Sequence, residues 1–214
     1  IFFALLCNNK SYKTYQNKHT SSENSMSEHQ NKVYLVTGGT TGIGAATVAA
    51  LAEAGATVIA TGRNPETLER ARQSLPQNTE LVASDAGDFE DIKKLAAHVK
   101  EKYGKLDGVV LNAGVAPFMP LEAWDESTFD HLFAVNVKGP FFLLQQIAPL
   151  LSQGASVVFN TSIVQHVGMA GTDLVDRLLV KAQGRDAECV VNGGEGSLVV
   201  GRVGGVSLLP QKLA

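Results

Sequence analysis

The chain is poor in the features that mark extracellular, membrane or nucleic-acid-binding proteins. Its 214 residues include 2 cysteines, Cys7 and Cys189, which form no motif. This argues against a disulfide framework, fits a reducing compartment, and leads us to expect a cytoplasmic protein without a metal site. No apolar run approaches the ~20 residues that span a bilayer. The net charge of −3 gives no reason to expect nucleic acid or a membrane surface as a partner.

The composition predicts one globular domain flanked by less regular ends. A hydrophobic fraction of 44% with 18% charged residues is ordinary for a globular protein, and the length allows a sizeable core. Residues 8–32 are dense in Asn, Ser, Thr, Lys and Gln without periodicity, which is typical of disorder. Met26 opens a short polar stretch, so we expect it to be the true start, with residues 1–25 as translated upstream sequence or a remnant of cloning. The divisions that we expect are a disordered leader over 1–31, a domain over 32–172 and an unassigned tail over 173–214.

A glycine-rich turn between a strand and a helix organises the middle of the chain. Val33–Val36 is an apolar run typical of a buried parallel strand, glycines follow at 38, 42 and 44, and Ala45–Ala54 is rich in good helix formers. At such a turn, unpaired N–H groups and the positive helix end attract phosphate, and glycines let the backbone approach it. The spacing G-x-x-x-G-x-G differs from the common G-x-G-x-x-G, and a tight turn without a ligand is the alternative.

Strands and helices then alternate along the sequence. Asn64 with Pro65, and Asp88, are typical helix starts. We expect strands over 33–36, 56–61, 80–84, 106–111 and 155–160, and a long helix over about 126–151 with a kink near Gly139-Pro140. This alternation predicts an α/β fold, a doubly wound parallel sheet covered by helices in three layers.

Several short motifs follow one another in a recognisable order. They are Thr37-Gly38-x-x-x-Gly42-Ile43-Gly44, Asp85 after the third strand, Asn112-Ala113-Gly114 after the fourth, Asn136 in the long helix and Ser162 after the fifth strand. With them, the stretch from about Lys32 to Thr172 resembles the short-chain dehydrogenase/reductase family. The resemblance implies a Rossmann-type NAD(P)-binding domain and hydride transfer between the cofactor and a small-molecule carbonyl or secondary alcohol.

The resemblance also implies a set of cofactor-binding positions. The turn formed by Gly38, Thr40, Thr41, Gly42, Ile43 and Gly44 would hold the pyrophosphate. Asp85 would accept a hydrogen bond from the adenine amino group with Ala86 beside the ring, and Asn112, Ala113 and Gly114 would flank the adenosine ribose. Asp85 could instead be a plain cap at the approach to a helix. Asn112 could equally close the fourth strand in a turn, and the two roles are compatible.

The end of the second strand bears on the choice of cofactor. NAD-binding members place a carboxylate there for the ribose 2′-hydroxyl, whereas this chain has Gly62 followed by Arg63. A guanidinium without a neighbouring acid at this point favours a 2′-phosphate, so we expect NADP(H), with NAD as the alternative. Arg63 could also be an ordinary solvated loop charge.

The catalytic residues that the resemblance implies are incomplete. Ser162 would polarise the carbonyl and Asn136 would anchor a water relay; a turn serine and a helix-kink amide are the alternatives. The family's Tyr-x-x-x-Lys pair would begin near Val175, with Leu179 at the lysine position, and all 4 tyrosines of the chain precede Ser162. The proton donor and the lysine that tunes it are therefore missing.

The absence of the Tyr-x-x-x-Lys pair is explained if the tail over 173–214 is translated from another reading frame. After about Thr172 the sequence is rich in Gly, Val and Leu, with no clean helical face and no long strand, and Val190-Val191-Asn192 comes too early for the family's sixth strand. We therefore expect a truncated or frameshifted family member, incomplete in its C-terminal strands and helix and inactive, whose full-length form could be a homo-oligomer. A non-catalytic nucleotide-binding protein and a product without a stable fold are the alternatives.

Overall fold

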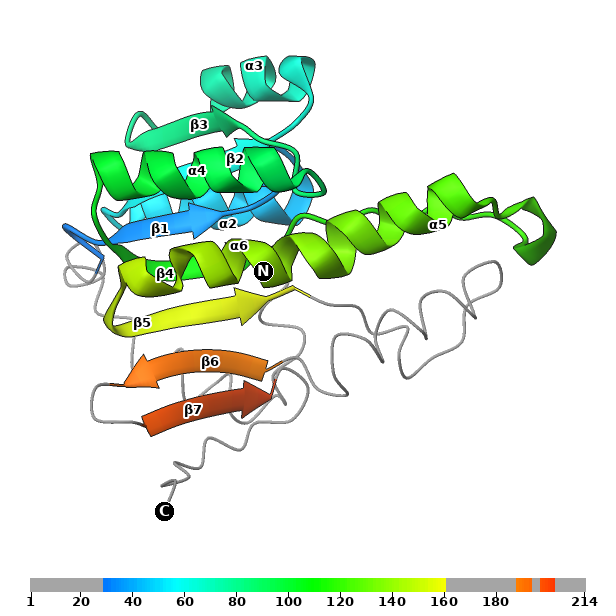
Figure 1. Ribbon diagram of the computed structural model, residues 1–214. Helices are drawn as coiled ribbons and strands as arrows, with labels where there is room; N and C mark the ends of the chain where they lie inside the picture. The colour runs from blue at the N-terminus through cyan, green and yellow to red at the C-terminus, as the bar shows by residue number, and fades with distance from the viewer. Residues whose placement is uncertain (1–28, 161–187, 194–196, 203–214) are drawn as a thin grey trace, which may run out of the picture.

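A parallel sheet forms the body of the protein in the computed structural model, which describes residues 29–160, 188–193 and 197–202 (Figure 1). The strand order is β3-β2-β1-β4-β5-β6-β7, and the first five of these strands run parallel. Their bounds are β1 Val33–Val36, β2 Thr57–Gly62, β3 Thr79–Ala83, β4 Leu106–Leu111 and β5 Leu151–Phe159. The order reverses between β1 and β4, and ligands of open α/β sheets bind at such a switch point.

Helices cover both faces of the sheet, as Figure 1 shows. Their bounds are α2 Gly42–Glu53, α3 Pro65–Ser74, α4 Phe89–Lys102, α5 Glu126–Phe133 and α6 Gly139–Ile147. One apolar cluster joins α4 and α6 to the sheet around Leu35 and Val109. A second cluster joins α2 to the opposite face around Val36 and Val58. The predicted three-layer, doubly wound α/β fold is confirmed.

The predicted helix starts are confirmed in atomic detail. The Asn64 side-chain oxygen accepts a hydrogen bond from the backbone N–H of Glu66 at 2.8 Å, and Pro65 follows in the first turn of α3. The Asp88 carboxylate accepts one from the N–H of Asp91 at 2.9 Å at the start of α4. Each cap satisfies a donor that the first helical turn leaves without a partner.

The long helix predicted over 126–151 is irregular near its middle and ends earlier than expected. A π-helical segment, η3 (Ala134–Lys138), separates α5 from α6, directly before Gly139-Pro140, near which the kink was expected. Pro140 has no N–H to give to the carbonyl four residues earlier, which favours a widened turn at this point. The helical part also ends earlier, with α6 at Ile147 and a 3₁₀ turn, η4, over Ala148–Leu150. The strand β5 follows at once and starts four positions before the predicted residue 155.

The tail contributes two strands of 6 residues each, which the sequence analysis did not place. They are β6 (Glu188–Gly193) and β7 (Ser197–Arg202), which pair antiparallel with each other, and β6 pairs antiparallel with β5. Two short apolar runs separated by glycines are typical of a hairpin. The sheet is therefore mixed at this edge. The expectations for Met26, Ser162 and the missing Tyr-x-x-x-Lys pair lie outside the described residues.

A nearly buried carboxylate fixes the amino end of β1 to the neighbouring strand β4. Asp107 is 7% exposed and accepts a hydrogen bond from the Val33 N–H at 2.9 Å, with the ammonium groups of Lys32 and Lys105 at 3.5 and 3.2 Å. Burial raises the pKa of Asp107, but the Val33 N–H and the two lysines outweigh it, so the pKa lies below its usual value. Asp107 therefore stabilises the fold above about pH 4, the pKa of an unfolded aspartate, and this contribution is lost as the pH falls through its lower folded pKa.

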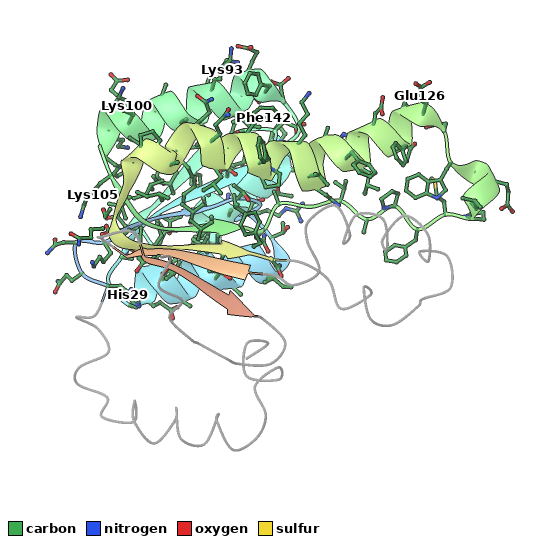
Figure 2. The ribbon with its side chains drawn as sticks, turned by 60° about the horizontal axis from the view of Figure 1, so that its bottom comes forward. His29, Lys93, Lys100, Lys105, Glu126 and Phe142 are labelled. Carbon is green, nitrogen blue, oxygen red and sulfur yellow. The ribbon has the colours of Figure 1, made fainter. Side chains whose placement is uncertain are left out.

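The arm that carries α5 extends past the carboxyl edge of the sheet, with Glu126 at its far end (Figures 1 and 2). His29 and Lys105 lie at the opposite, amino edge (Figure 2). Within the part of the chain that the structure describes, no helix combines the length and apolar character needed to cross a membrane.

Candidate nucleotide site

The turn after β1 is locked to the segment after β4 by the hydroxyl of Thr37. The Thr37 Oγ1 accepts hydrogen bonds from the backbone N–H groups of Asn112 and Ala113, both at 3.0 Å. The Asn112 Nδ2 in turn donates to the carbonyls of Thr37 at 3.1 Å and Gly38 at 3.2 Å. Two of the predicted segments, 37–44 and 112–114, are therefore brought together at the switch point of the sheet, and Thr37 is the residue that joins them.

The three predicted glycines are needed for different reasons. A Cβ on Gly44 would lie 2.1 Å from the Gly38 carbonyl oxygen, and one on Gly38 would lie 2.9 Å from the Ala113 Cα. Close packing therefore explains Gly44, and Gly38 combines close packing with a φ of +63°, which favours glycine. Gly42 has a φ of +53°, which favours glycine, and it faces open space with no heavy atom within 4 Å of an added Cβ.

The start of α2 is open, unlike the starts of α3, α4 and α5. The Thr41 side chain makes no capping hydrogen bond, and the first turn of α2 contains no acidic residue. By contrast, α3, α4 and α5 each have a side-chain cap and an acidic residue in the first turn. The first N–H groups of α2 therefore keep their positive potential, as an anion site requires.

The remaining predicted residues of this turn face two ways. Ile43 is 56% exposed, and Thr41 is exposed as well, so both lie at the open side of the turn. Thr40 is turned toward β2 and α3, where its Oγ1 lies 3.3 Å from the Oγ1 of Thr67. It also fills the space beside Gly62, since a Cβ there would lie 2.7 Å from Thr40.

The second predicted group meets at the ends of β2 and β3. The Arg63 Nη1 donates to the Asp85 Oδ2 at 3.2 Å and lies 3.3 Å from the His131 Nε2 of α5. The Asp85 Oδ1 accepts a hydrogen bond from the Gly87 N–H at 2.8 Å, which agrees with the alternative of a cap at the approach to α4. Sequence reasoning missed His131 altogether, because the contact joins residues 68 positions apart and leaves no local signal.

Two hollows of different size lie at this edge. An open groove of about 620 Å³ is lined by Arg63, Asn64, Pro65, Ala83, Ser84, Asp85 and Asp91. A small cavity of about 20 Å³ lies deeper, and its lining includes Thr37, Thr61, Ser84, Ala86, Ala113 and Gly139. The cavity has room for about one water molecule. A nucleotide would therefore have to lie in the open groove and over the turn after β1.

Asn136 braces the chain after β4. Its Oδ1 accepts a hydrogen bond from the Val115 N–H, and its Nδ2 donates to the Val115 carbonyl, both at 2.8 Å. A Cβ on Gly114 would lie 3.5 Å from the same Oδ1. The amide therefore ties η3 to the segment after β4, and π-helical segments of this kind are frequent at functional sites.

A further residue of this edge was not predicted from the sequence. The Asn160 Nδ2 donates to the Asn112 Oδ1 at 2.8 Å, and its N–H donates to the Leu111 carbonyl at 3.0 Å. Asn160 thus connects the end of β5 to the network around Thr37. Its place at the carboxyl end of an apolar strand was the signal in the sequence that could have indicated a site residue.

The sequence was compared with known protein families to assign the chain that carries this site. The profile of the family described as short chain dehydrogenase matches residues 32–174, more than half of the chain. The chain belongs to the short-chain dehydrogenase/reductase family. The family assignment made from the motifs is confirmed, and with it the membership in a group of NAD(P)-dependent oxidoreductases.

Individual relatives agree with this assignment. An uncharacterised oxidoreductase of Listeria monocytogenes is 35% identical over 139 residues, covering 63% of this chain and 56% of its own length. The 3-oxoacyl-[acyl-carrier-protein] reductase of Thermotoga maritima is 33% identical over 147 residues, or 66% of this chain and 60% of the reductase. A short chain dehydrogenase from Escherichia coli CFT073, complexed with NADPH, has a TM-score of 0.65 at 30% identity, covering 74% of this chain and 69% of that chain. The chain thus spans less than two thirds of the length of the two sequence relatives.

Proposed function

We propose that the protein binds NADP(H) across the carboxyl ends of β1, β2 and β4. The observation that carries this is the position of Arg63, a guanidinium directly after β2 in an open groove, where Gly62 leaves no acid at the strand end. A planar guanidinium is suited to a phosphate, and an acid at the strand end itself would repel one. The Asp85 carboxylate, which lines the same groove, is paired with Arg63. The complex of the similar Escherichia coli dehydrogenase with NADPH supports the same choice.

The other residues have complementary roles in this proposal. The N–H groups at the open start of α2 and the turn over 38–44 hold the pyrophosphate. Asp85 and Ala86 border the adenine, and Asn112, Ala113 and Gly114 border the adenosine ribose. Once Arg63 donates to a 2′-phosphate in place of Asp85, the Asp85 Oδ2 can accept a hydrogen bond from the adenine amino group.

The reaction of the full-length form would be hydride transfer to or from a small-molecule carbonyl or secondary alcohol. The bound nicotinamide supplies or accepts the hydride. Ser162 would polarise the substrate oxygen, and Asn136, by bracing Val115, would hold one wall of the site. We further propose that this form is cytoplasmic and that it forms homo-oligomers.

We predict that the chain as it stands binds the cofactor but turns over poorly. No tyrosine follows Ser162, so the proton donor and its lysine partner are missing, a loss of ~10²–10⁴ in rate. The test is oxidation of NADPH with a panel of ketones and aldehydes, with the Thermotoga maritima reductase as the positive control on its own substrate. Turnover within tenfold of that control would contradict the prediction and reveal another proton donor.

A second prediction concerns cofactor choice. Arg63→Ala is expected to weaken NADPH binding about 10–100-fold and to leave NADH binding unchanged, because a charge-assisted hydrogen bond to the 2′-phosphate is lost. Isothermal titration of both cofactors measures this. Arg72→Ala is the matched control, since Arg72 is an exposed arginine of α3 that pairs with Glu69 in its own helix. Equal losses for NADPH and NADH would refute the role given to Arg63.

A non-catalytic nucleotide-binding protein is the second candidate function. It is favoured by the concentration of the predicted cofactor residues in 38–114, while the catalytic pair is missing from the sequence. NADPH binding without turnover, together with a transcript that encodes no Tyr-x-x-x-Lys pair in any frame after Gly171, would support it. The third possibility, a product without a stable fold, is excluded if the chain unfolds in one cooperative thermal transition.

A further inference from the structure

His131 lies on α5, outside every motif of the sequence, yet it contacts Arg63, which lines the groove at the ends of β2 and β3. Its Nε2 is 3.3 Å from the Arg63 Nη1, and the same nitrogen of Arg63 bonds the Asp85 carboxylate at 3.2 Å. The arginine thus bridges α5 and the chain after β3. Both the arginine and the histidine are exposed, so a ligand can reach the pair from solvent.

The contact has one possible hydrogen-bond direction. Arginine can only donate hydrogen bonds, so the Nε2 of His131 is the acceptor in its hydrogen bond with Arg63. An anion that takes over the donors of Arg63 would have to lie within hydrogen-bond distance of Nη1. That position is beside Nε2, and the imidazole tautomer that carries its proton on Nε2 can donate to an anion there.

The charges around the groove make a second donor useful. The charged groups that line the groove are Arg63 after β2, Asp85 after β3 and Asp91 on α4. Of these, Arg63 contacts His131, and Asp130 precedes His131 on α5. Lys94 pairs with Asp91 at 3.1 Å, whereas Arg63 is the one cationic partner of Asp85 among the described residues. A phosphate that engages Arg63 therefore approaches the Asp85 carboxylate, and a second donor on the side of α5 offsets this repulsion.

We propose that His131 is a second specificity-determining residue for the 2′-phosphate of the cofactor, donating to it from Nε2 beside Arg63. The inference rests on the proposed preference for NADP(H) and deepens it, because it adds α5 to the recognition of the adenine half. Arg63 and His131 then grip the phosphate from two sides of the groove.

Two adenine nucleotides that differ only in this group provide the test. Adenosine 2′,5′-bisphosphate and 5′-AMP are titrated calorimetrically into the complete chain. The Kd of 5′-AMP divided by the Kd of the bisphosphate measures recognition of the 2′-phosphate. His131→Ala is expected to reduce the ratio about tenfold and to leave 5′-AMP binding unchanged. His131→Gln, which keeps a donor, is expected to restore part of it. The control is His29→Ala, at the amino edge of the sheet (Figure 2).

The outcomes separate the two proposals. If the unmodified chain binds both nucleotides equally, the NADP(H) preference fails and the role of His131 fails with it. If Arg63→Ala removes the discrimination but His131→Ala does not, the preference stands and the inference about His131 is wrong. In the Arg63→Ala background, His131→Ala should lower the ratio further, and no further loss would mean that His131 acts only by holding Arg63, contrary to the proposal.

Discussion

Gly44→Ala is expected to abolish cofactor binding. The added Cβ would lie 2.1 Å from the Gly38 carbonyl oxygen and 2.6 Å from the Asn112 Nδ2. Neither neighbour can move freely, since the Asn112 amide is bonded to the carbonyls of Thr37 and Gly38. The start of α2 must therefore shift away from the turn that it shares with β1, and the N–H groups leave the pyrophosphate position. Overpacking of this kind costs about 3 kcal/mol, and we expect NADPH affinity to fall more than ~10²-fold.

Calorimetric titration of NADPH and thermal unfolding measure the two effects of Gly44→Ala. Gly154→Ala is the control, because Gly154 lies in β5 with a φ of +80° and no heavy atom within 4 Å of an added Cβ. It should destabilise the protein by about 1–2 kcal/mol through backbone strain and leave NADPH affinity intact. Unchanged NADPH binding by Gly44→Ala would show that the contact of α2 with this turn is irrelevant to the cofactor.

Gly139→Ala is expected to destabilise the fold strongly. A Cβ at this position would lie 1.9 Å from the Ala86 carbonyl oxygen, which belongs to the segment after β3, and 3.1 Å from the Ala134 carbonyl oxygen. Both contacts are backbone atoms, so α6 must move off the sheet. We expect a loss of about 3 kcal/mol or more, or a Tm lower by roughly 6–12 °C for a chain of this size.

The same substitution should weaken NADPH binding, because Ala86 is proposed to border the adenine. Gly104→Ala serves as the comparison: Gly104 has a φ of +69°, and its nearest neighbour, the Lys100 carbonyl oxygen, would lie 3.9 Å from an added Cβ. It should lower the Tm through strain alone and spare NADPH affinity. If Gly139→Ala melted at the temperature of the unmodified chain, the close packing of α6 on the segment after β3 would be disproved.

Local rules were sufficient for the elements and for their order. Apolar runs predicted β1 and β4 at their observed bounds, and the chemistry of Asn64 and Asp88 predicted the starts of α3 and α4. The reason is that strand burial and helix capping depend on residues close together in sequence. The alternation of these elements then determined the α/β fold class.

Features that depend on distant contacts could not be predicted. The approach of Gly139 to Ala86 and of His131 to Arg63 joins segments whose spacing carries no signal. The π-helical segment η3 arises where Asn136 bonds the Val115 backbone, a contact that periodicity does not contain. The pairing of β6 with β5 was missed because short apolar runs are ambiguous without their partner strand.

The observed ion pair gives Arg63 two states in this account. Without cofactor its guanidinium pairs with Asp85, and with a 2′-phosphate it turns to the phosphate and releases the carboxylate. The pair is partly exposed, with side chains 52% and 32% accessible, so breaking it costs little. The cofactor with the 2′-phosphate can therefore displace Asp85, whereas NAD(H) has no group to do so.

The most direct test of the account is a calorimetric titration of the unmodified chain with NADPH and, separately, with NADH. We predict a single site for NADPH and an affinity at least ~10-fold higher than for NADH, since one charge-assisted contact to the 2′-phosphate is worth this much. Absence of NADPH binding by the folded chain, or equal affinity for the two cofactors, would contradict the central claim that the turn after β1 and Arg63 form an NADP(H) site.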